Sequence, residues 1–169
     1  MVAMNSAKSL IKKYDLKKHP EGGYFKEVYR SSEIIPRQAL PSRFKGARSF
    51  STSIYYLLPS GAVSRLHRIA SDEIWHFYLG GPLKFIQISP EGIMDTVILG
   101  QDIVVGQTLQ HVVPAGWWFG ARPATRSYSF VGCTVAPGFD FKDFELADIA
   151  ALSRRFPHLK QEIRRFNPL

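Results

Sequence analysis

Residues Gly61–Gly80 read GAVSRLHRIASDEIWHFYLG, and they place His67, Glu73 and His76 in one short segment. Imidazole and carboxylate side chains bind metals and transfer protons near neutral pH. The aromatic and β-branched residues around Glu73 and His76 are typical of a half-buried strand. This combination indicates a functional site inside a β-sheet pocket rather than on a surface loop.

Short strand-like segments follow one another along the rest of the chain, with turn residues between them. The 13 glycines and 11 prolines are scattered rather than clustered. Regular short strands separated by such turns indicate an antiparallel sandwich or barrel, and therefore an all-β fold class. The expected strands cover residues 24–30, 49–58, 63–69, 73–79, 83–88, 93–99, 109–113, 117–121 and 127–135.

Helical patterns occur at the two ends of the sequence. Residues Asn5–Leu16 predict a short helix, and Asp143 is expected to cap the first of the C-terminal helices. Residues 31–46 contain prolines and predict a long loop, a candidate lid or dimer contact. We expect a single domain over residues 1–169. Within it, the barrel body covers about 20–140 and the C-terminal helices cover about 143–166.

The chain is strongly basic, with a formal net charge of +8 and a pI of about 9.7. Lysines concentrate near the N-terminus and arginines near the C-terminus, as expected for the solvated faces of terminal helices. No helix-turn-helix, zinc-finger or RNP pattern accompanies them. Binding of an anionic small molecule explains the excess positive charge more simply than nucleic-acid binding does. We therefore expect a small-molecule ligand and no nucleic acid.

The sequence also favours a cytoplasmic protein. No apolar run approaches the roughly 20 residues that span a bilayer, so no membrane association is expected. The first residues lack the apolar core of a signal peptide. The single Cys133 cannot form an internal disulfide, which agrees with a reducing compartment.

The spacing Gly61-(x)5-His67-x-Ile69-(x)3-Glu73-(x)6-Gly80 resembles the first signature of the cupin superfamily, with Ile69 in place of one histidine. A second, looser match begins at Gly106 and contains Pro114-Ala115-Gly116, and the position of its histidine is Phe119.

More closely, four segments resemble an uncharacterised family of small cupins, and this resemblance covers residues 19–146. It implies a jelly-roll β-barrel, usually dimeric, with a pocket in the barrel mouth, and it therefore predicts a homodimer. The family's reaction is not settled. The four segments are HPEGGYF (19–25), SDEIWHFYLGGPL (71–83), VVPAGWWFGARP (112–123) and VGCTVAPGFDFKDFEL (131–146).

The resemblance also bears on metal binding. Metal-dependent cupins use two histidines and a glutamate from the first signature and a histidine from the second. Here Ile69 and Phe119 occupy two of those places, and two remaining ligands are too few for a tight divalent site. We therefore expect no cofactor. A divalent metal held by His67, Glu73 and His76 stays open as the alternative, although strand alternation turns His76 to the other face.

Without a metal, His67 and Glu73 are the candidate catalytic acid–base pair. A structural hydrogen-bonded pair is the simpler alternative, and a structural partner is likewise the simpler role for His76. Glu21 and Tyr24 can reach the pocket from the HPEGGYF turn. The simpler alternative is that this turn has a purely structural role. The candidate ligand-binding residues are Tyr24, Arg65, Trp75, His76, Phe77, Trp118 and Phe119.

The expected function is that of a small-molecule-binding cupin whose activity the sequence leaves open. The candidate reaction is metal-independent isomerisation or epimerisation of a sugar, a nucleotide-sugar or another anionic metabolite. This expectation rests on a resemblance to cupin-like sugar-nucleotide epimerases, which work without a metal and deprotonate a carbon next to a carbonyl. A metal-dependent dioxygenase or isomerase is one alternative, and a non-catalytic ligand-binding module is the other.

Overall fold

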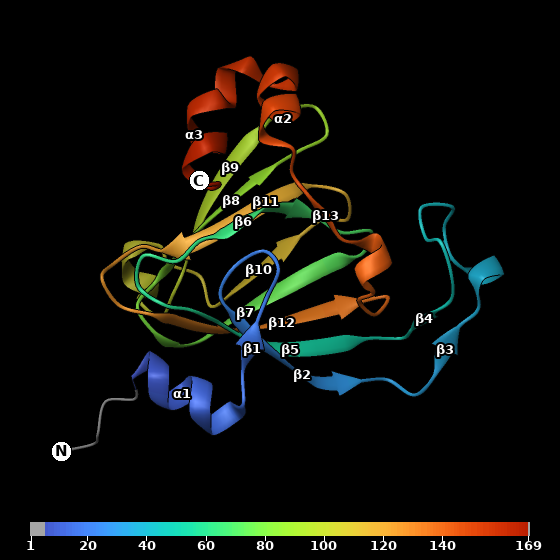
Figure 1. The fold of residues 1–169 in the computed structure, drawn as a ribbon, viewed down its shortest axis with the longest axis horizontal. Coiled ribbons are helices and arrows are strands. Elements are labelled where there is room, and N and C mark those ends of the chain that lie inside the picture. The colour runs from blue at the N-terminus through green and yellow to red at the C-terminus, as the bar shows by residue number, and fades with distance from the viewer. Residues whose placement is uncertain (1–5, 169) are drawn as a thin grey trace.

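The alternating strands form two antiparallel sheets that face each other (Figure 1). The structure is a computed structural model that describes residues 6–168. The first sheet has the order β1 (Lys17–Lys18), β2 (Tyr24–Arg30), β5 (Thr52–Leu58), β12 (Ser129–Ala136), β7 (Asp72–Gly80) and β10 (Gln110–Val113). The second has the order β13 (Glu145–Leu146), β6 (Ser64–Arg68), β11 (Trp118–Pro123), β8 (Leu83–Ile88) and β9 (Met94–Leu99). This architecture confirms the predicted all-β jelly-roll class with short terminal helices.

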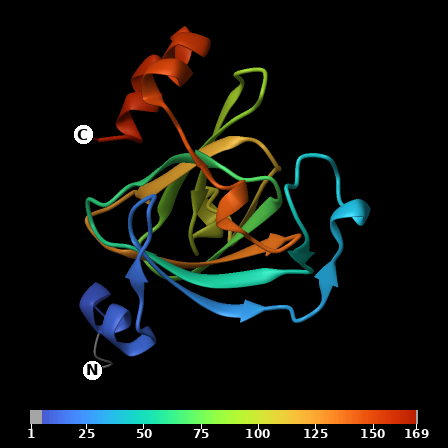
Figure 2. The ribbon, with the colours of Figure 1, turned by 45° about the vertical axis from the view of Figure 1, so that its right-hand side comes forward.

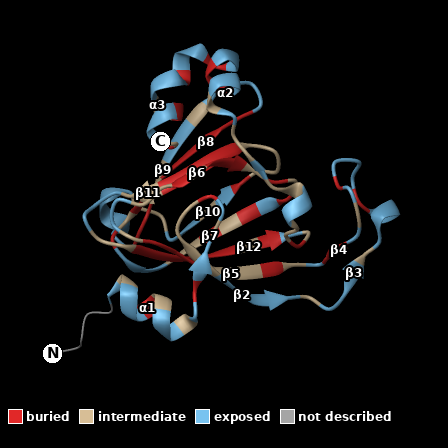
Figure 3. Ribbon diagram, in the orientation of Figure 1, coloured by how far each residue is buried: buried red, intermediate tan, exposed pale blue. Residues whose placement is uncertain are grey.

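The main hydrophobic core lies between the two sheets, where successive side chains alternate inward and outward. Strand β7 shows the alternation: Glu73 and Trp75 are buried, whereas His76 is partly exposed. Figure 3 shows that burial is concentrated in the strands. The fully buried aromatic residues of this core include Tyr56, Trp75, Phe85 and Phe119.

Helices cover parts of both outer faces. Helix α1 (Ala7–Tyr14) is capped by Ser6, which accepts from the N–H of Ser9, and it buries Leu10 against the first sheet. Helices α2 (Ile149–Arg155) and α3 (Lys160–Arg165), with the 3-10 turn η4 (Pro157–Leu159) between them, cover the second sheet. None of the helices in residues 6–168 is long and apolar enough to cross a membrane.

The first C-terminal helix begins later than the sequence predicted. Asp148, rather than Asp143, caps α2, since its side chain accepts from the N–H of Ala151. Asp143 instead ends the 3-10 turn η3 (Phe141–Asp143), and the residues that follow form β13 on the edge of β6. The alternative sheet pairing therefore replaces the first turn of the expected helix.

The predicted long loop forms an arm that extends away from the barrel (Figures 1 and 2). The arm contains β3 (Ile34–Ile35), the 3-10 turn η1 (Arg37–Ala39) and β4 (Arg48–Ser49), and β3 pairs with β4. Another 3-10 turn, η2 (Ile103–Val105), lies between β9 and β10. Arg43 Nε donates to the carbonyl oxygen of Ala70 at 2.6 Å and so fastens the arm to the barrel.

Candidate functional site

A cavity of about 290 Å³ opens between the sheets near the base of the arm. Residues of β2, β5, β6, β7 and β12 form its walls, together with the turn before β2 and the segment after β12. Its apolar lining consists of Phe25, Ile54, Tyr56, Ile69, Trp75, Val135, Phe139, Phe141 and Phe144. Its titratable lining consists of His19, Glu21, Glu27, Arg30, His67, Glu73, Cys133 and Asp140.

Glu21 enters the cavity from the glycine turn between β1 and β2. Gly22 and Gly23 have φ angles of 121° and 70°, and a side chain at Gly22 would overlap the backbone of Val63. This close approach of two chain segments requires glycine. It buries the Glu21 carboxylate, whose Oε1 accepts a hydrogen bond of 2.7 Å from the hydroxyl of Ser64.

Arg65 holds the same turn and does not line the cavity. Its guanidinium donates to the carbonyl oxygens of Pro20 at 2.5 Å and Glu21 at 3.3 Å. Its backbone N–H also donates to the Glu21 carbonyl oxygen at 2.9 Å. The predicted ligand-binding arginine thus positions Glu21 through its backbone.

His67 lies within hydrogen-bond distance of Glu21. The Nδ1 atom of His67 lies 2.7 Å from the carbonyl oxygen of Arg65, and because a carbonyl oxygen only accepts, Nδ1 carries a hydrogen. The Nε2 atom lies 3.0 Å from Glu21 Oε2, a separation that requires a second proton between these atoms. The carboxylate that contacts His67 is therefore Glu21, and not Glu73 as the sequence suggested.

His19 adds a second imidazole to this cluster. Its Nδ1 lies 3.4 Å from Glu21 Oε2 and 3.3 Å from the backbone nitrogen of Glu21. Burial lowers the pKa of His19, and the Glu21 charge opposes that shift. His19 was not among the predicted site residues, because only Glu21 and Tyr24 of the HPEGGYF turn were expected to reach the pocket.

Glu73 is a buried carboxyl group that holds its proton at neutral pH. Burial, followed by the negative charge of Glu21, raises the pKa of Glu73 to about 8. Cys133 lines the same wall, and burial also raises the pKa of its thiol. The thiol therefore stays protonated, which argues against a nucleophilic role.

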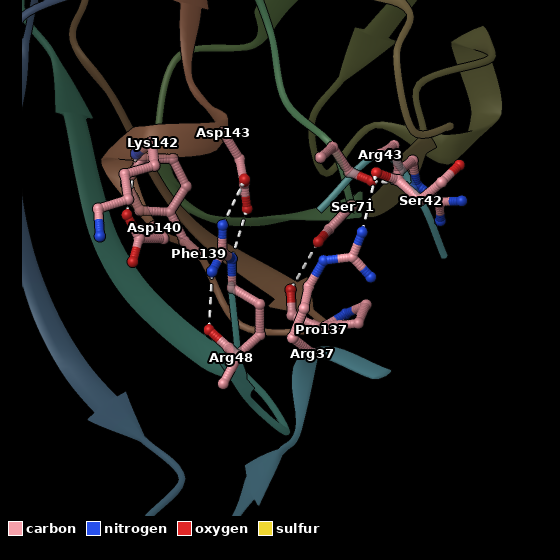
Figure 4. A network of polar contacts seen from close by, with 12 residues as sticks. Arg37, Ser42, Arg43, Arg48, Ser71, Pro137, Phe139, Asp140, Lys142 and Asp143 are labelled. Carbon is pink, nitrogen blue, oxygen red and sulfur yellow. Dashed lines mark hydrogen bonds and ion pairs between the residues drawn. The ribbon is translucent and has the colours of Figure 1, made fainter. Parts of the chain in front are cut away.

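Aromatic side chains of the segment after β12 form the rim of the cavity. Phe144 lies 5.3 Å from the His67 ring, and Phe141 stacks on His19 at 6.0 Å, both between ring centroids. Arg48 holds this segment through Asp143, with hydrogen bonds of 2.6 and 2.5 Å between side chains that are almost fully buried (Figure 4). This rim was not predicted from the sequence, since the segment was expected to lead into a helix.

The positive charge of Arg30 at the mouth is already paired. Arg30 makes hydrogen bonds of 3.0 and 2.7 Å to the two carboxylate oxygens of Glu27, and it also donates to the carbonyl oxygen of Phe139 at 3.1 Å. Asp140 lines the mouth beside them. Among the described residues that line the cavity, Arg30 is the one arginine or lysine.

His76 lies on the outer face of β7, as strand alternation predicts. Its Nε2 is 3.1 Å from the hydroxyl oxygen of Thr134, and its Nδ1 is 3.0 Å from the side-chain nitrogen of Gln110. Burial lowers the pKa of His76. Its structural contacts separate it from His67 and Glu73, so these three residues do not form the alternative metal site.

Four other candidate ligand-binding residues also lie outside the cavity lining, whereas Trp75 is part of it. Phe119 packs behind His67 with ring centroids 4.0 Å apart. Trp118 faces the opposite way, beneath the C-terminal helices. Tyr24 packs near α1, and Phe77 contacts the main core. The alternation of β11 explains why one of its two neighbouring aromatic residues faces away.

The donor set does not fit the metal centre of metal-dependent cupins. Ile69 and Phe119 are buried apolar residues at two of the four ligand positions that the cupin signatures provide. Across residues 6–168, no group of three or more histidine, cysteine or acidic side chains has a metal-binding arrangement. The residues that are present are better suited to proton transfer.

The facing sheets and the cavity at one end define a cupin-type jelly-roll barrel. The chain belongs to the family described as "Cupin superfamily (DUF985)", which residues 8–147 match. Protein SO0799 from Shewanella oneidensis is 39% identical, with a TM-score of 0.88 over 98% of this chain and 99% of that chain. A hypothetical protein from Leishmania major is 34% identical, with a TM-score of 0.85 over 96% and 98% of the two chains.

A relative of known sequence is the uncharacterized protein YML079W from Saccharomyces cerevisiae. It is 33% identical over 150 residues, which cover 82% of this chain and 74% of the relative. The names of these three proteins state no activity. The family therefore establishes the fold, and the evidence on the protein's reaction comes from the residues of the cavity.

Proposed function

We propose that the cavity binds a compact carbonyl compound and moves a proton on the carbon next to the carbonyl, without a metal. The observation that carries this proposal is that Glu73, with a pKa of about 8, lines the same cavity as the proton-sharing pair of His67 and Glu21. A carboxylate with a pKa near the operating pH is an effective general base. Groups in one site that differ in proton affinity can divide the roles of base and acid.

In the proposed reaction, ionised Glu73 takes the proton from the carbon atom. The electron pair of the broken C–H bond forms the C=C bond of an enol, and the carbonyl oxygen receives the proton held between His67 and Glu21. When that carbon also carries a hydroxyl group, Glu73 returns the proton to the former carbonyl carbon, the hydroxyl proton passes to the His67–Glu21 pair, and the isomer forms. When solvent instead delivers a proton to the opposite face of the original carbon, the enol proton passes back to the His67–Glu21 pair, Glu73 releases its proton to solvent, and the epimer forms. Both outcomes balance without an oxidant or a reductant.

The size and charge of the cavity narrow the substrate class. A volume of about 290 Å³ is at the lower end of the range for ligand pockets, so the nucleotide of a nucleotide-sugar would lie outside. Arg30 is already bound to Glu27, and the other described lining residues include no lysine or arginine. We therefore favour an uncharged hydroxy-carbonyl compound over the anionic metabolite that the composition suggested.

Hydrogen exchange provides the test. The protein is incubated in D₂O with a panel of small aldoses, hydroxy-ketones and keto acids, and loss of the α-proton signal is followed by proton NMR. We expect exchange that becomes faster as the pH rises toward 8, and that is abolished in Glu73→Gln. His76→Gln is the matched control, because this imidazole lies outside the cavity and its loss should leave exchange unchanged.

Two outcomes would redirect the proposal. Binding of a panel member without exchange at any pH would favour the non-catalytic binding module. Stoichiometric metal in untagged protein, lost in His67→Ala, would favour the metal-dependent enzyme instead.

We further propose that the protein acts in the cytoplasm as a homodimer. The reduced, buried Cys133 supports the compartment. The edge of β2 supports the dimer, because β1 pairs with this strand only at Tyr24 and Phe25. Beyond them, Val28 and Tyr29 are exposed on an edge that a second copy of the chain can cover.

A further inference from the structure

A second group of charged side chains lies at the end of the barrel opposite the cavity. Lys84 of β8, Arg122 of β11 and Arg126 of the next loop line a shallow groove, whose other side is the 60–63 turn between β5 and β6. Figures 1 and 2 show both connections on the side of the barrel away from the arm.

Two of these cations are placed directly opposite each other. Lys84 and Arg122 are Cα partners in the antiparallel pair of β8 and β11, so their side chains project from the same face of the sheet. Like charges at such positions destabilise strand pairing unless an anion lies between them. This pair therefore has a cost that the fold alone does not explain.

Neighbouring acidic groups do not compensate for this charge. No aspartate or glutamate lines the groove, and within residues 6–168 none of Lys84, Arg122 and Arg126 takes part in an ion pair. Elsewhere in the molecule, Arg30, Arg48 and Arg68 each contact a carboxylate.

The groove is also shaped to receive a ligand. The Arg122 guanidinium lies 5.3 Å from the centre of the Phe166 ring, a contact that limits its freedom before any ligand binds. Across the groove, Gly61 has a φ angle of 78°, and the space where a side chain would start is open. Ligand atoms can therefore approach the backbone of this turn closely.

We propose that this groove binds the phosphate group of a soluble phosphorylated metabolite, as a site separate from the cavity. A phosphate carries about two negative charges near neutral pH, and its oxygens are arranged tetrahedrally. It can accept from the ammonium of Lys84 and from both guanidinium groups at once, whereas a carboxylate has one charge and two oxygens in a plane. The three positive side chains of the groove therefore suit the charge of a phosphate better than the single charge of a carboxylate.

Calorimetric titration of the full chain with pyrophosphate and with inorganic phosphate, at low ionic strength, tests the proposal. We expect saturable binding of one pyrophosphate per chain, weakened about tenfold or more in Lys84→Gln and in Arg126→Gln. Arg122→Gln should weaken it as well, but this residue also packs on Phe166, so the other two variants carry the test. Circular dichroism checks that each variant is folded.

Arg154→Gln is the matched control, because it removes one exposed positive charge from α2 and leaves the groove intact. Its affinity for pyrophosphate should stay within about twofold of the wild type. Equal losses in Arg154→Gln and Lys84→Gln would show a net-charge effect and overturn the site. No saturable binding of pyrophosphate, or binding confined to vesicles that contain phosphatidic acid, would also overturn it.

Discussion

Three buried side chains lie close together in the cavity and influence one another's protonation: the carboxyl groups of Glu21 and Glu73 and the imidazole of His67. His67 Nε2 lies 3.0 Å from Glu21 Oε2, and the negative charge of Glu21 helps to raise the pKa of Glu73. Because these groups are buried, each charge acts on its neighbours over a short distance with little screening. A change at one residue is therefore expected to alter the protonation of another.

Glu73 should make the protein less stable as the pH rises. Its pKa is about 8 in the folded chain and near 4.5 when exposed, so between these values the folded state binds one more proton than the unfolded state. The stabilising contribution is complete below pH 4.5 and is lost as the pH rises through about 8, at about 1 kcal/mol per pH unit. Urea denaturation between pH 5 and about 8.5 measures this slope.

Glu73→Gln removes this slope, because the amide mimics the protonated carboxyl group and does not ionise. At pH 7 to 8 we expect the variant to be more stable than the wild type, by roughly 1–3 kcal/mol. Glu91→Gln, at an exposed turn, is the control and should follow the wild-type pH profile. Parallel profiles for the wild type and Glu73→Gln would contradict the raised pKa.

Loss of the Glu21 charge should lower the pKa of Glu73. Glu21 is the second cause of the raised pKa after burial, so Glu21→Gln should move the titration of Glu73 to a pH below about 8. Carbon-13 NMR of the glutamate side-chain carboxyl groups can follow this titration. An unchanged midpoint in a folded Glu21→Gln variant would show that the two carboxyl groups do not interact.

At the scale of elements, the cavity depends on a segment that belongs to neither sheet. The residues from Phe139 to Phe144 form the aromatic rim, and their position depends on the pairing of Asp143 with Arg48 at the base of the arm. The arm and the rim are far apart in the sequence. Their ion pair is nevertheless almost completely shielded from water, which makes it sensitive to the loss of either partner.

Arg48→Ala should destabilise the protein by about 3–5 kcal/mol, since it leaves the buried Asp143 carboxylate without a partner. Urea denaturation at pH 7 measures the loss. The control is Arg68→Ala: its ion pair with Glu145 is exposed, with side-chain exposures of 36% and 54%, and its loss should cost less than about 1 kcal/mol. Equal losses at Arg48 and Arg68 would contradict the structural role of the buried pair.

The elements also show why some boundaries were predicted and others were not. The predicted strand 24–30 agrees with β2, and the predicted strand 83–88 agrees with β8, because aromatic and β-branched residues between turn signals mark both. The segment 143–148 was expected to be helical because Asp143 is a good capping residue. Its pairing with the edge of β6 depends on a strand that is distant in the sequence.

For the molecule as a whole, the dimer proposal predicts a measurable mass. Light scattering at micromolar concentration should give twice the chain mass of 19.1 kDa. Val28→Lys should shift the protein toward the monomer, because a charged side chain on an exposed edge opposes strand pairing between copies. Ile93→Lys is the control, since Ile93 is also exposed but lies in the turn before β9. A wild-type monomer would overturn the proposal.

The sequence by itself determined the class of fold and located three cavity residues, His67, Glu73 and Trp75. It could do so because strand alternation and turn preferences are local properties, and because signature spacing reports which residues share a strand face. Only the tertiary structure decided that Glu21 is the partner of His67, and that His19 and the aromatic rim complete the cavity. These contacts join separate segments through a glycine turn, a buried ion pair and the exclusion of water, none of which is encoded at a fixed spacing along the chain.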